Sequence, residues 1–65
     1  MERRHVSSSN LSSVGYLNGV LEIQFHSGGI YQYSGVPESV YLGLMSAGSK
    51  GTYFSTHIKN RYSAR

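Results

Sequence analysis

Residues 14–26, VGYLNGVLEIQFH, hold the pattern that decides the fold of this 65-residue chain. Asn18-Gly19 is a strong hairpin signal, because both residues tolerate the positive φ angles of a type I′ turn. After this turn, hydrophobic and polar residues alternate to the end of the stretch, which is typical of a strand with one buried face. The stretch therefore predicts an antiparallel hairpin, with strands over residues 14–16 and 20–26.

The residues on both sides of this hairpin extend it into a sheet. Residues 27–29 (SGG) predict a second turn, and residues 30–33 (IYQY) predict the next strand. Tyr31 and Tyr33 then point to one face of the sheet, because side chains alternate along a strand. Residues 6–13 are rich in serine and fit either a flexible leader or a lead-in strand. The sequence thus predicts an antiparallel meander of three or four strands.

The spacing of hydrophobic residues changes after the sheet. Pro37 suits the first position of a helix, and the apolar residues that follow form one helical stripe. Gly48 and Gly51 are expected to end or interrupt this helix. A second short helix is predicted from residues that recur every four positions: Phe54, Ile58 and Tyr62. The fold class is therefore α+β, with the meander followed by two short helices packed on one face.

The length and composition indicate one small domain over residues 1–65, with residues 1–5 flexible and residues 63–65 as a tail. A chain of this size has a thin core. It has no cysteine, which excludes disulfides and thiolate zinc sites. Self-association is one way for such a domain to gain stability, so we expect a homo-oligomer. No signal peptide or membrane span is visible, which favours a soluble cytoplasmic protein.

The formal net charge of +3 comes mostly from basic residues near the two ends of the chain. Five such residues are Arg3, Arg4, Lys59, Arg61 and Arg65. Chain termini are often close together in small domains, so these side chains can form one basic patch that favours phosphate-bearing partners. An ordinary solubilising surface charge explains the same residues equally well.

The sequence gives little support for catalysis or metal binding. His5, His26 and His57 show no HxH or HExxH spacing, and the serines lack a G-x-S-x-G context. The three acidic residues are scattered along the chain and suggest no carboxylate pair. We therefore expect a protein that is not an enzyme and holds no metal or cofactor.

Residues 46–52, SAGSKGT, contain the ingredients of an anion site. The segment offers glycines for close backbone approach, hydroxyl groups, one lysine and the N–H groups of a helix start. Its spacing is not that of a P-loop. The alternative is a plain turn between two helices with Ser49 as the N-cap. On the anion-site interpretation, Lys50 contacts phosphate, and Ser49 and Gly51 donate hydrogen bonds.

Three further polar residues and the tyrosines complete the candidate binding site. Ser9 and Asn10 belong to a polar run that suits ligand contacts, and Arg61 supplies a second basic group. Tyr31 and Tyr33, with Tyr16 beside them, can form an aromatic face on which bases stack. The alternative is that these rings fill the core, and we expect this for at least one of Tyr31 and Tyr33.

An ordered series of short motifs resembles one known family. The series is Ser8-Ser9-Asn10, Val14-Gly15-Tyr16, Leu-x-Ile-x-Phe at 21–25, residues 29–33, Val36-Pro37-Glu38, Ser49-Lys50-Gly51, Phe54, Ile58 and Tyr62. It is similar to the KTSC domain family, named from its occurrence at the C-terminus of some lysyl-tRNA synthetases. The resemblance covers residues 5–62. It implies a small stand-alone bacterial or bacteriophage protein, with RNA binding as a suggested role.

Three functions remain open from the sequence. The first is a non-enzymatic module that binds nucleic acid or RNA through its basic residues and tyrosines. The second is a receptor for a nucleotide-like molecule, such as a phage sponge that sequesters a cyclic nucleotide or cyclic ADP-ribose defence signal in a pocket between subunits. The third is a protein-interaction module. We expect a non-enzymatic binder of a phosphate-bearing ligand, either a nucleotide or a nucleic acid.

Overall fold

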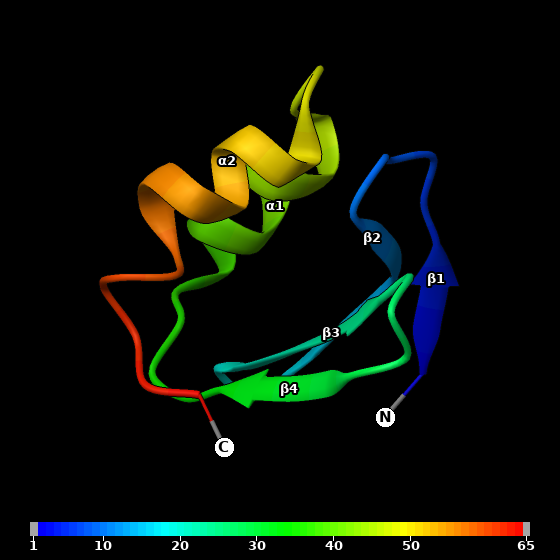
Figure 1. The fold of residues 1–65 in the computed structure, drawn as a ribbon. Helices are drawn as coiled ribbons and strands as arrows, with labels where there is room; N and C mark the ends of the chain where they lie inside the picture. Colours follow the sequence, from blue (N-terminus) through cyan, green and yellow to red (C-terminus); the bar gives the residue numbers. More distant parts are fainter. Residues whose placement is uncertain (1, 65) are drawn as a thin grey trace.

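The computed structural model describes residues 2–64 and places four strands before two helices. The elements are β1 (Arg3–His5), β2 (Leu11–Leu17), β3 (Val20–Phe25), β4 (Ile30–Tyr33), α1 (Glu38–Ser46) and α2 (Lys50–His57). Figure 1 shows both helices on the same side of the sheet. The predicted α+β arrangement is confirmed.

The strands form one antiparallel sheet in the order β1-β2-β3-β4. At the β2–β3 turn, Asn18 has φ 51° and Gly19 has φ 80°. These are the two positive φ angles that the type I′ prediction requires. The hairpin at residues 14–26 is therefore the centre of the sheet, with one strand added on each side.

The N-terminal segment contributes an edge strand to the sheet. Of residues 1–5, which the sequence analysis expected to be flexible, Arg3–His5 form the edge strand β1 and pair with residues 13–15 of β2, and Met1 lies outside the described residues. The first strand of the hairpin is also longer than predicted and begins at Leu11, with a register irregularity before Ser13. Residues 6–10, called the serine loop below, connect β1 to β2.

The core lies between the sheet and the helices. Its buried members are Leu11, Val14, Leu21, Ile23, Tyr33, Val36, Leu44, Phe54 and Ile58. The Tyr33 ring packs edge-on against Phe54, with ring centroids 5.6 Å apart, and only 5% of the residue is exposed. Burial raises the pKa of the Tyr33 hydroxyl, and the neighbouring Tyr31 adds to this shift. Tyr33 is thus a core residue, which leaves Tyr31 as the candidate for stacking.

The second helix differs in its limits from the prediction. It begins at Lys50, so Gly51 lies inside it and does not interrupt α1. It ends at His57, where the carbonyl oxygen of Phe54 accepts hydrogen bonds from the N–H groups of both Ile58 and Lys59. The Lys59 bond spans five residues, so the regular four-residue pattern of the helix stops there. Tyr62 therefore lies beyond the helix, in a turn where it packs against the core.

The first helix begins one residue later than expected. Pro37 takes the N-cap position with extended backbone angles, and the helix starts at Glu38. Ala64, the last residue that the structure describes, forms an isolated bridge with Tyr33 at the β4 edge, and Arg65 lies outside the described residues. Within residues 2–64, neither helix has the length and apolar character needed to cross a membrane.

Candidate functional site

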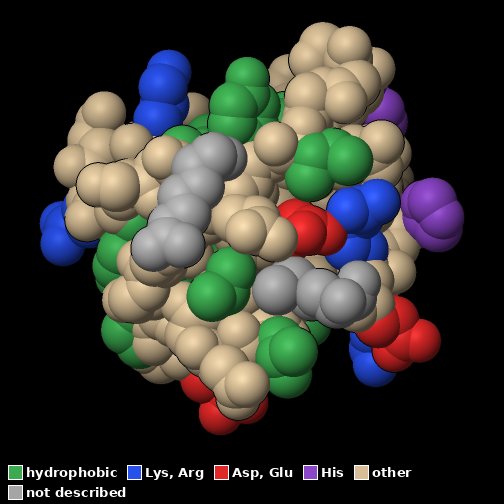
Figure 2. Space-filling view, turned by 90° about the horizontal axis from the view of Figure 1, so that it is seen from below, with side chains coloured by type: hydrophobic (Ala, Val, Ile, Leu, Met, Phe, Trp, Pro, Cys, Tyr) green, Lys and Arg blue, Asp and Glu red, His purple; other side chains and the backbone are tan. Residues whose placement is uncertain are grey.

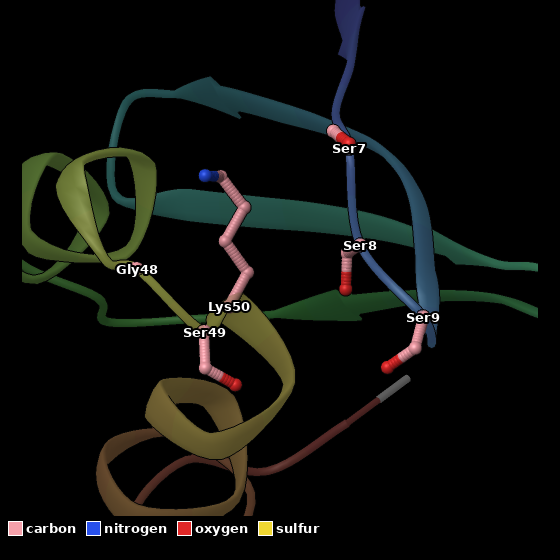
Figure 3. A pocket seen from close by; sticks show the side chains of 6 residues that line it. All are labelled: Ser7, Ser8, Ser9, Gly48, Ser49 and Lys50. Atoms are coloured by element: carbon pink, nitrogen blue, oxygen red, sulfur yellow. The ribbon is translucent and has the colours of Figure 1, made fainter.

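A polar cleft of about 340 Å³ lies where the serine loop meets the start of α2. Figure 3 shows the loop on one side of this cleft and the first turn of the helix on the other, with the Ser9 hydroxyl directed toward the helix. The cleft is lined by Ser7, Ser8, Ser9, Gly48, Ser49 and Lys50. Two segments about 40 positions apart in the sequence, each singled out for its polar residues, thus form one site.

The helix side of the cleft is built by an N-cap. Ser49 Oγ accepts a hydrogen bond from the Thr52 backbone N–H (3.4 Å) and donates one to Thr52 Oγ1 (3.0 Å). The predicted N-cap role of Ser49 is confirmed. The N–H groups of Lys50 and Gly51 have no carbonyl partner within the helix. The helix therefore presents N–H donors and the positive end of its dipole at the cleft.

Lys50 connects the two helices at the edge of this cleft. Its Nζ donates to the Ala47 carbonyl oxygen at 3.3 Å, just beyond the C-terminal end of α1. The ammonium group thus offsets the negative end of one helix dipole while its remaining hydrogens stay available to a ligand. Lys50 is the one charged side chain among the described residues that line the cleft.

Asn10 and Gly51 lie against each other, although they are far apart in the sequence. A Cβ added at Gly51 would come within 2.8 Å of Asn10 Nδ2. Gly51 therefore leaves the space in which the Asn10 amide sits beside the first turn of α2. The structure thus brings together five of the predicted ligand contacts: Ser9, Asn10, Ser49, Lys50 and Gly51.

The serine loop is held in place by Ser8 and by His26, a residue that the sequence analysis missed as part of the site. Ser8 Oγ accepts hydrogen bonds from the backbone N–H groups of Asn10 and Leu11, both at 3.3 Å. His26 Nε2 donates to the Ser8 carbonyl oxygen (2.8 Å), and the His26 N–H donates to that of Asn10 (2.9 Å). Only the alternation of β3 hinted that His26 points away from the core.

The other predicted contacts lie outside the cleft. Tyr31 is 44% exposed and packs edge-on against Phe25, with ring centroids 5.6 Å apart. It stands at the same end of the sheet as the serine loop, next to the β3–β4 turn that contains His26. Tyr16 stacks on Tyr41 of α1 and donates its hydroxyl to the Val36 carbonyl. It therefore packs between the sheet and α1, away from Tyr31.

Arg61 and the other terminal basic residues do not gather at this site. Arg61 follows the C-terminal end of α2, whereas the cleft is at its N-terminal end. Arg3 and Arg4 belong to β1, at one edge of the sheet, and Ala64 bridges to β4 at the other edge. The described basic residues near the two termini therefore form separate groups, and Arg65 lies outside the described part of the chain.

The sheet face without helices carries a polar connection across all four strands. Figure 2 looks onto this side and shows an acidic side chain beside a basic one, with hydrophobic groups around them. Arg3 Nη1 on β1 reaches over β2 to Glu22 Oε1 on β3, and Gln32 Nε2 on β4 donates to Glu22 Oε2 at 2.8 Å. The hydrogen bonds from Gln32 and Arg3 hold the pKa of the Glu22 carboxyl below its usual value, although burial opposes this.

A second cavity of about 240 Å³ lies on the same uncovered face, beside this connection. Its lining residues are Arg3, His5, Ser13 and Gln24, and Ser13 Oγ donates to Gln24 Oε1 at 3.2 Å. The sequence did not indicate this cavity, because its residues come from three strands. Residues 2–64 contain no group of three or more side chains placed to hold a metal ion.

Comparison with known proteins agrees with this architecture. The KTSC domain family matches residues 7–62, which is most of the chain. The chain belongs to the KTSC domain family. The resemblance read from its motifs is thereby confirmed, and the matched residues include both sides of the cleft.

Three similar proteins are informative. A crystal structure of a KTSC domain protein from Yersinia pestis has a TM-score of 0.95 and 48% identity, covering 98% of this chain and 93% of that one. An uncharacterised protein of Stutzerimonas stutzeri is 38% identical over 64 residues, covering 95% of this chain and 90% of its own length. A lysine–tRNA ligase of Nostoc punctiforme is 45% identical over 42 residues, which is 65% of this chain and 8% of the ligase.

Proposed function

We propose that this KTSC domain is a non-enzymatic module that binds a phosphate-bearing ligand, a nucleotide or a nucleic acid, in the cleft between the serine loop and α2. The observation that carries the proposal is the meeting of Ser9 and Asn10 with Ser49, Lys50 and Gly51. These residues come from two distant segments, and all of them can donate hydrogen bonds.

The chemistry of the cleft suits a phosphate group. A helix N-terminus offers N–H donors and a positive dipole end, and Lys50 adds a full positive charge. None of the described lining residues is acidic, so nothing in the lining opposes an anion. The side chains at the cleft are serines, a lysine and an asparagine amide, and none of them forms a described pairing of nucleophile and base. Binding therefore fits the cleft better than catalysis does.

A nucleotide fits this arrangement better than phosphate alone, because an aromatic surface stands at the same end of the sheet. Tyr31 has an exposed ring supported by Phe25. Bases stack on such rings regardless of their identity. In this proposal, the phosphate lies in the cleft and the base extends along the end of the sheet toward Tyr31. The similarity to part of a lysine–tRNA ligase adds support for a nucleic-acid partner.

The experiment that tests the proposal is a calorimetric titration of the protein with AMP and with a short single-stranded RNA at two salt concentrations. We expect Lys50→Ala to weaken binding about tenfold, since hydrogen bonds to charged groups contribute about 1.5–3 kcal/mol. Lys59→Ala is the matched control, because it removes the same charge at the other end of α2. Equal losses in the two variants, or no loss in either, would contradict the assignment of Lys50.

A phage-type sponge is a second form of the same proposal. The cleft is open to solvent, with the loop and the helix on opposite sides (Figure 3), so one copy of the chain cannot enclose a small ligand. A second copy placed over the cleft would enclose a cyclic nucleotide or cyclic ADP-ribose signal between subunits. A ligand-to-chain stoichiometry below one, together with a dimeric or larger mass in solution, distinguishes this form from a monomeric binder.

A protein-interaction module is the alternative favoured by one observation on the other side of the sheet. Leu17 and Ile30, on the uncovered face, are 53% and 47% exposed. If the domain binds protein through this face, Lys50→Ala leaves binding unchanged and charged substitutions at Leu17 abolish it. A pull-down with both variants separates this function from phosphate binding.

A further inference from the structure

Residues that line the second cavity, on the uncovered face of the sheet, are near the serine loop of the cleft in the sequence. His5 ends β1 directly before the serine loop, and Ser13 follows the loop by three residues. The loop therefore separates the two cavities, with the cleft on its helix side and the second cavity on the uncovered side. Both are at the end of the sheet where β1 ends and β2 begins.

The groups that line the second cavity are predominantly hydrogen-bond donors. Gln24 Oε1 is occupied by the Ser13 hydroxyl, which leaves the Gln24 amide hydrogens for another acceptor. Arg3 uses one Nη1 contact for Glu22, and a guanidinium has five N–H groups in total. His5 is exposed at the rim and supplies a ring N–H. This set suits a phosphate or another oxyanion.

Glu22 stands next to this cavity without making it acidic. The residue is only 9% exposed, and each carboxylate oxygen accepts a hydrogen bond, one from Arg3 and one from Gln32. The carboxylate is therefore satisfied within the sheet and holds the guanidinium in place beside the cavity. The described lining of the cavity contains no acidic residue.

From these observations we infer that the second cavity is a second phosphate site, and that the ligand of this domain carries two separate phosphate groups, one on each side of the serine loop. This inference rests on the proposed function of the cleft. It names the ligand class as a dinucleotide, linear or cyclic, or a longer single strand, and it assigns Arg3, His5 and Gln24 as the contacts of the second phosphate.

The test compares ligands with one and two phosphates by calorimetry: AMP, the linear dinucleotide pApA and cyclic di-AMP. Two variants lower the net charge equally. Gln24→Glu places a negative charge in the second cavity, whereas Arg4→Gln removes a positive charge on the opposite face of β1, because Arg4 pairs with Val14 and alternates with Arg3. A third variant, Arg3→Gln with Glu22→Gln, keeps the net charge at +3 and removes the guanidinium.

We expect the unmodified protein to bind pApA or cyclic di-AMP at least tenfold more tightly than AMP. Gln24→Glu and the double variant, each checked for folding by circular dichroism, should reduce that advantage to less than threefold, while Arg4→Gln keeps it. A gain with pApA alone identifies a linear strand, and a gain with cyclic di-AMP alone identifies a cyclic ligand.

Other outcomes overturn the inference in distinguishable ways. If Gln24→Glu and Arg4→Gln weaken binding equally and the double variant has no effect, only net charge matters and the second site is wrong. The cleft then still stands if Lys50→Ala weakens AMP binding. If the unmodified protein binds none of the three ligands, the proposed function fails together with the inference.

Discussion

The two faces of the sheet cover their side chains in different ways, and β3 contributes residues to both faces. On the face under the helices, Leu21 and Ile23 are fully buried in the core. On the other face, Glu22 is almost as well covered, but by hydrogen bonds to Arg3 and Gln32 and not by a second layer of structure. A domain of this size has one hydrophobic layer, so its other face is organised by polar contacts between strands.

The largest difference in stability is expected between two isoleucine substitutions, one on each face of the sheet. Ile23→Ala should lower the free energy of unfolding by about 2–5 kcal/mol, because it leaves a cavity in the core. Ile30→Ala on the uncovered face should change it by no more than about 0.5 kcal/mol. Urea denaturation of both variants measures the difference. Similar losses would mean that the uncovered face is also packed against something in solution.

A smaller effect is expected from the polar connection on the uncovered face. Glu22→Gln should lower the free energy of unfolding by about 1–2 kcal/mol at pH 7, since it removes a charge-assisted pair that is partly screened by water. Glu2→Gln, at an exposed position, should cost no more than about 0.5 kcal/mol. Denaturant unfolding of both variants at pH 7 gives these values.

The pH dependence of the stability loss in Glu22→Gln shows whether that loss comes from the charge of Glu22. The folded pKa of Glu22 is lowered from 4.5, so the carboxylate contributes stability that is fully present above about pH 4.5. That contribution is lost as the pH falls through the lowered folded pKa. The difference between the unmodified protein and Glu22→Gln should therefore shrink below pH 4.5. A difference that is constant with pH would show that the variant acts through packing and not through charge.

The smallest effect on stability is expected at the end of the sheet, where the serine loop meets α2. Gly51→Ala displaces the flexible Asn10 side chain but improves helix propensity. The free energy of unfolding should therefore change by no more than about 0.5 kcal/mol. Its affinity for AMP should nevertheless fall at least threefold, because Asn10 leaves its place. Thermal melting and calorimetry measure the two quantities. A stability loss above about 1.5 kcal/mol would mean that the loop belongs to the folding core.

Much of the fold was predictable from local patterns. Asn18-Gly19 set the central turn, and the alternation after it assigned Leu21 and Ile23 to one face and Glu22 to the other. Ser49 was recognised as an N-cap because its type and position suit the start of a helix. The helix limits were less accurate, since Gly51 is a weak helix former that the N-cap and the packing of Phe54 still keep within α2.

The cleft was predictable in part. Ser9, Asn10, Ser49, Lys50 and Gly51 stood out by residue type, but their meeting depends on how the serine loop is held. His26 holds the loop from the β3–β4 turn, through a hydrogen bond to Ser8, which is 18 positions away in the sequence. Arg61 shows the opposite case, because its charge made it a candidate and the direction of α2 carries it away from the cleft.

By itself, the sequence determined the family, the antiparallel hairpin and the residues with the chemistry for an anion, because turns, alternation and capping are properties of neighbours along the chain. Only the tertiary structure decided which tyrosine is buried, that Arg3 crosses β2 to reach Glu22, and that the serine loop lies against Gly51. Those outcomes depend on how β1 pairs with β2 and on the side of the sheet that the helices cover. Both are set by contacts between residues far apart in sequence, which local patterns do not encode.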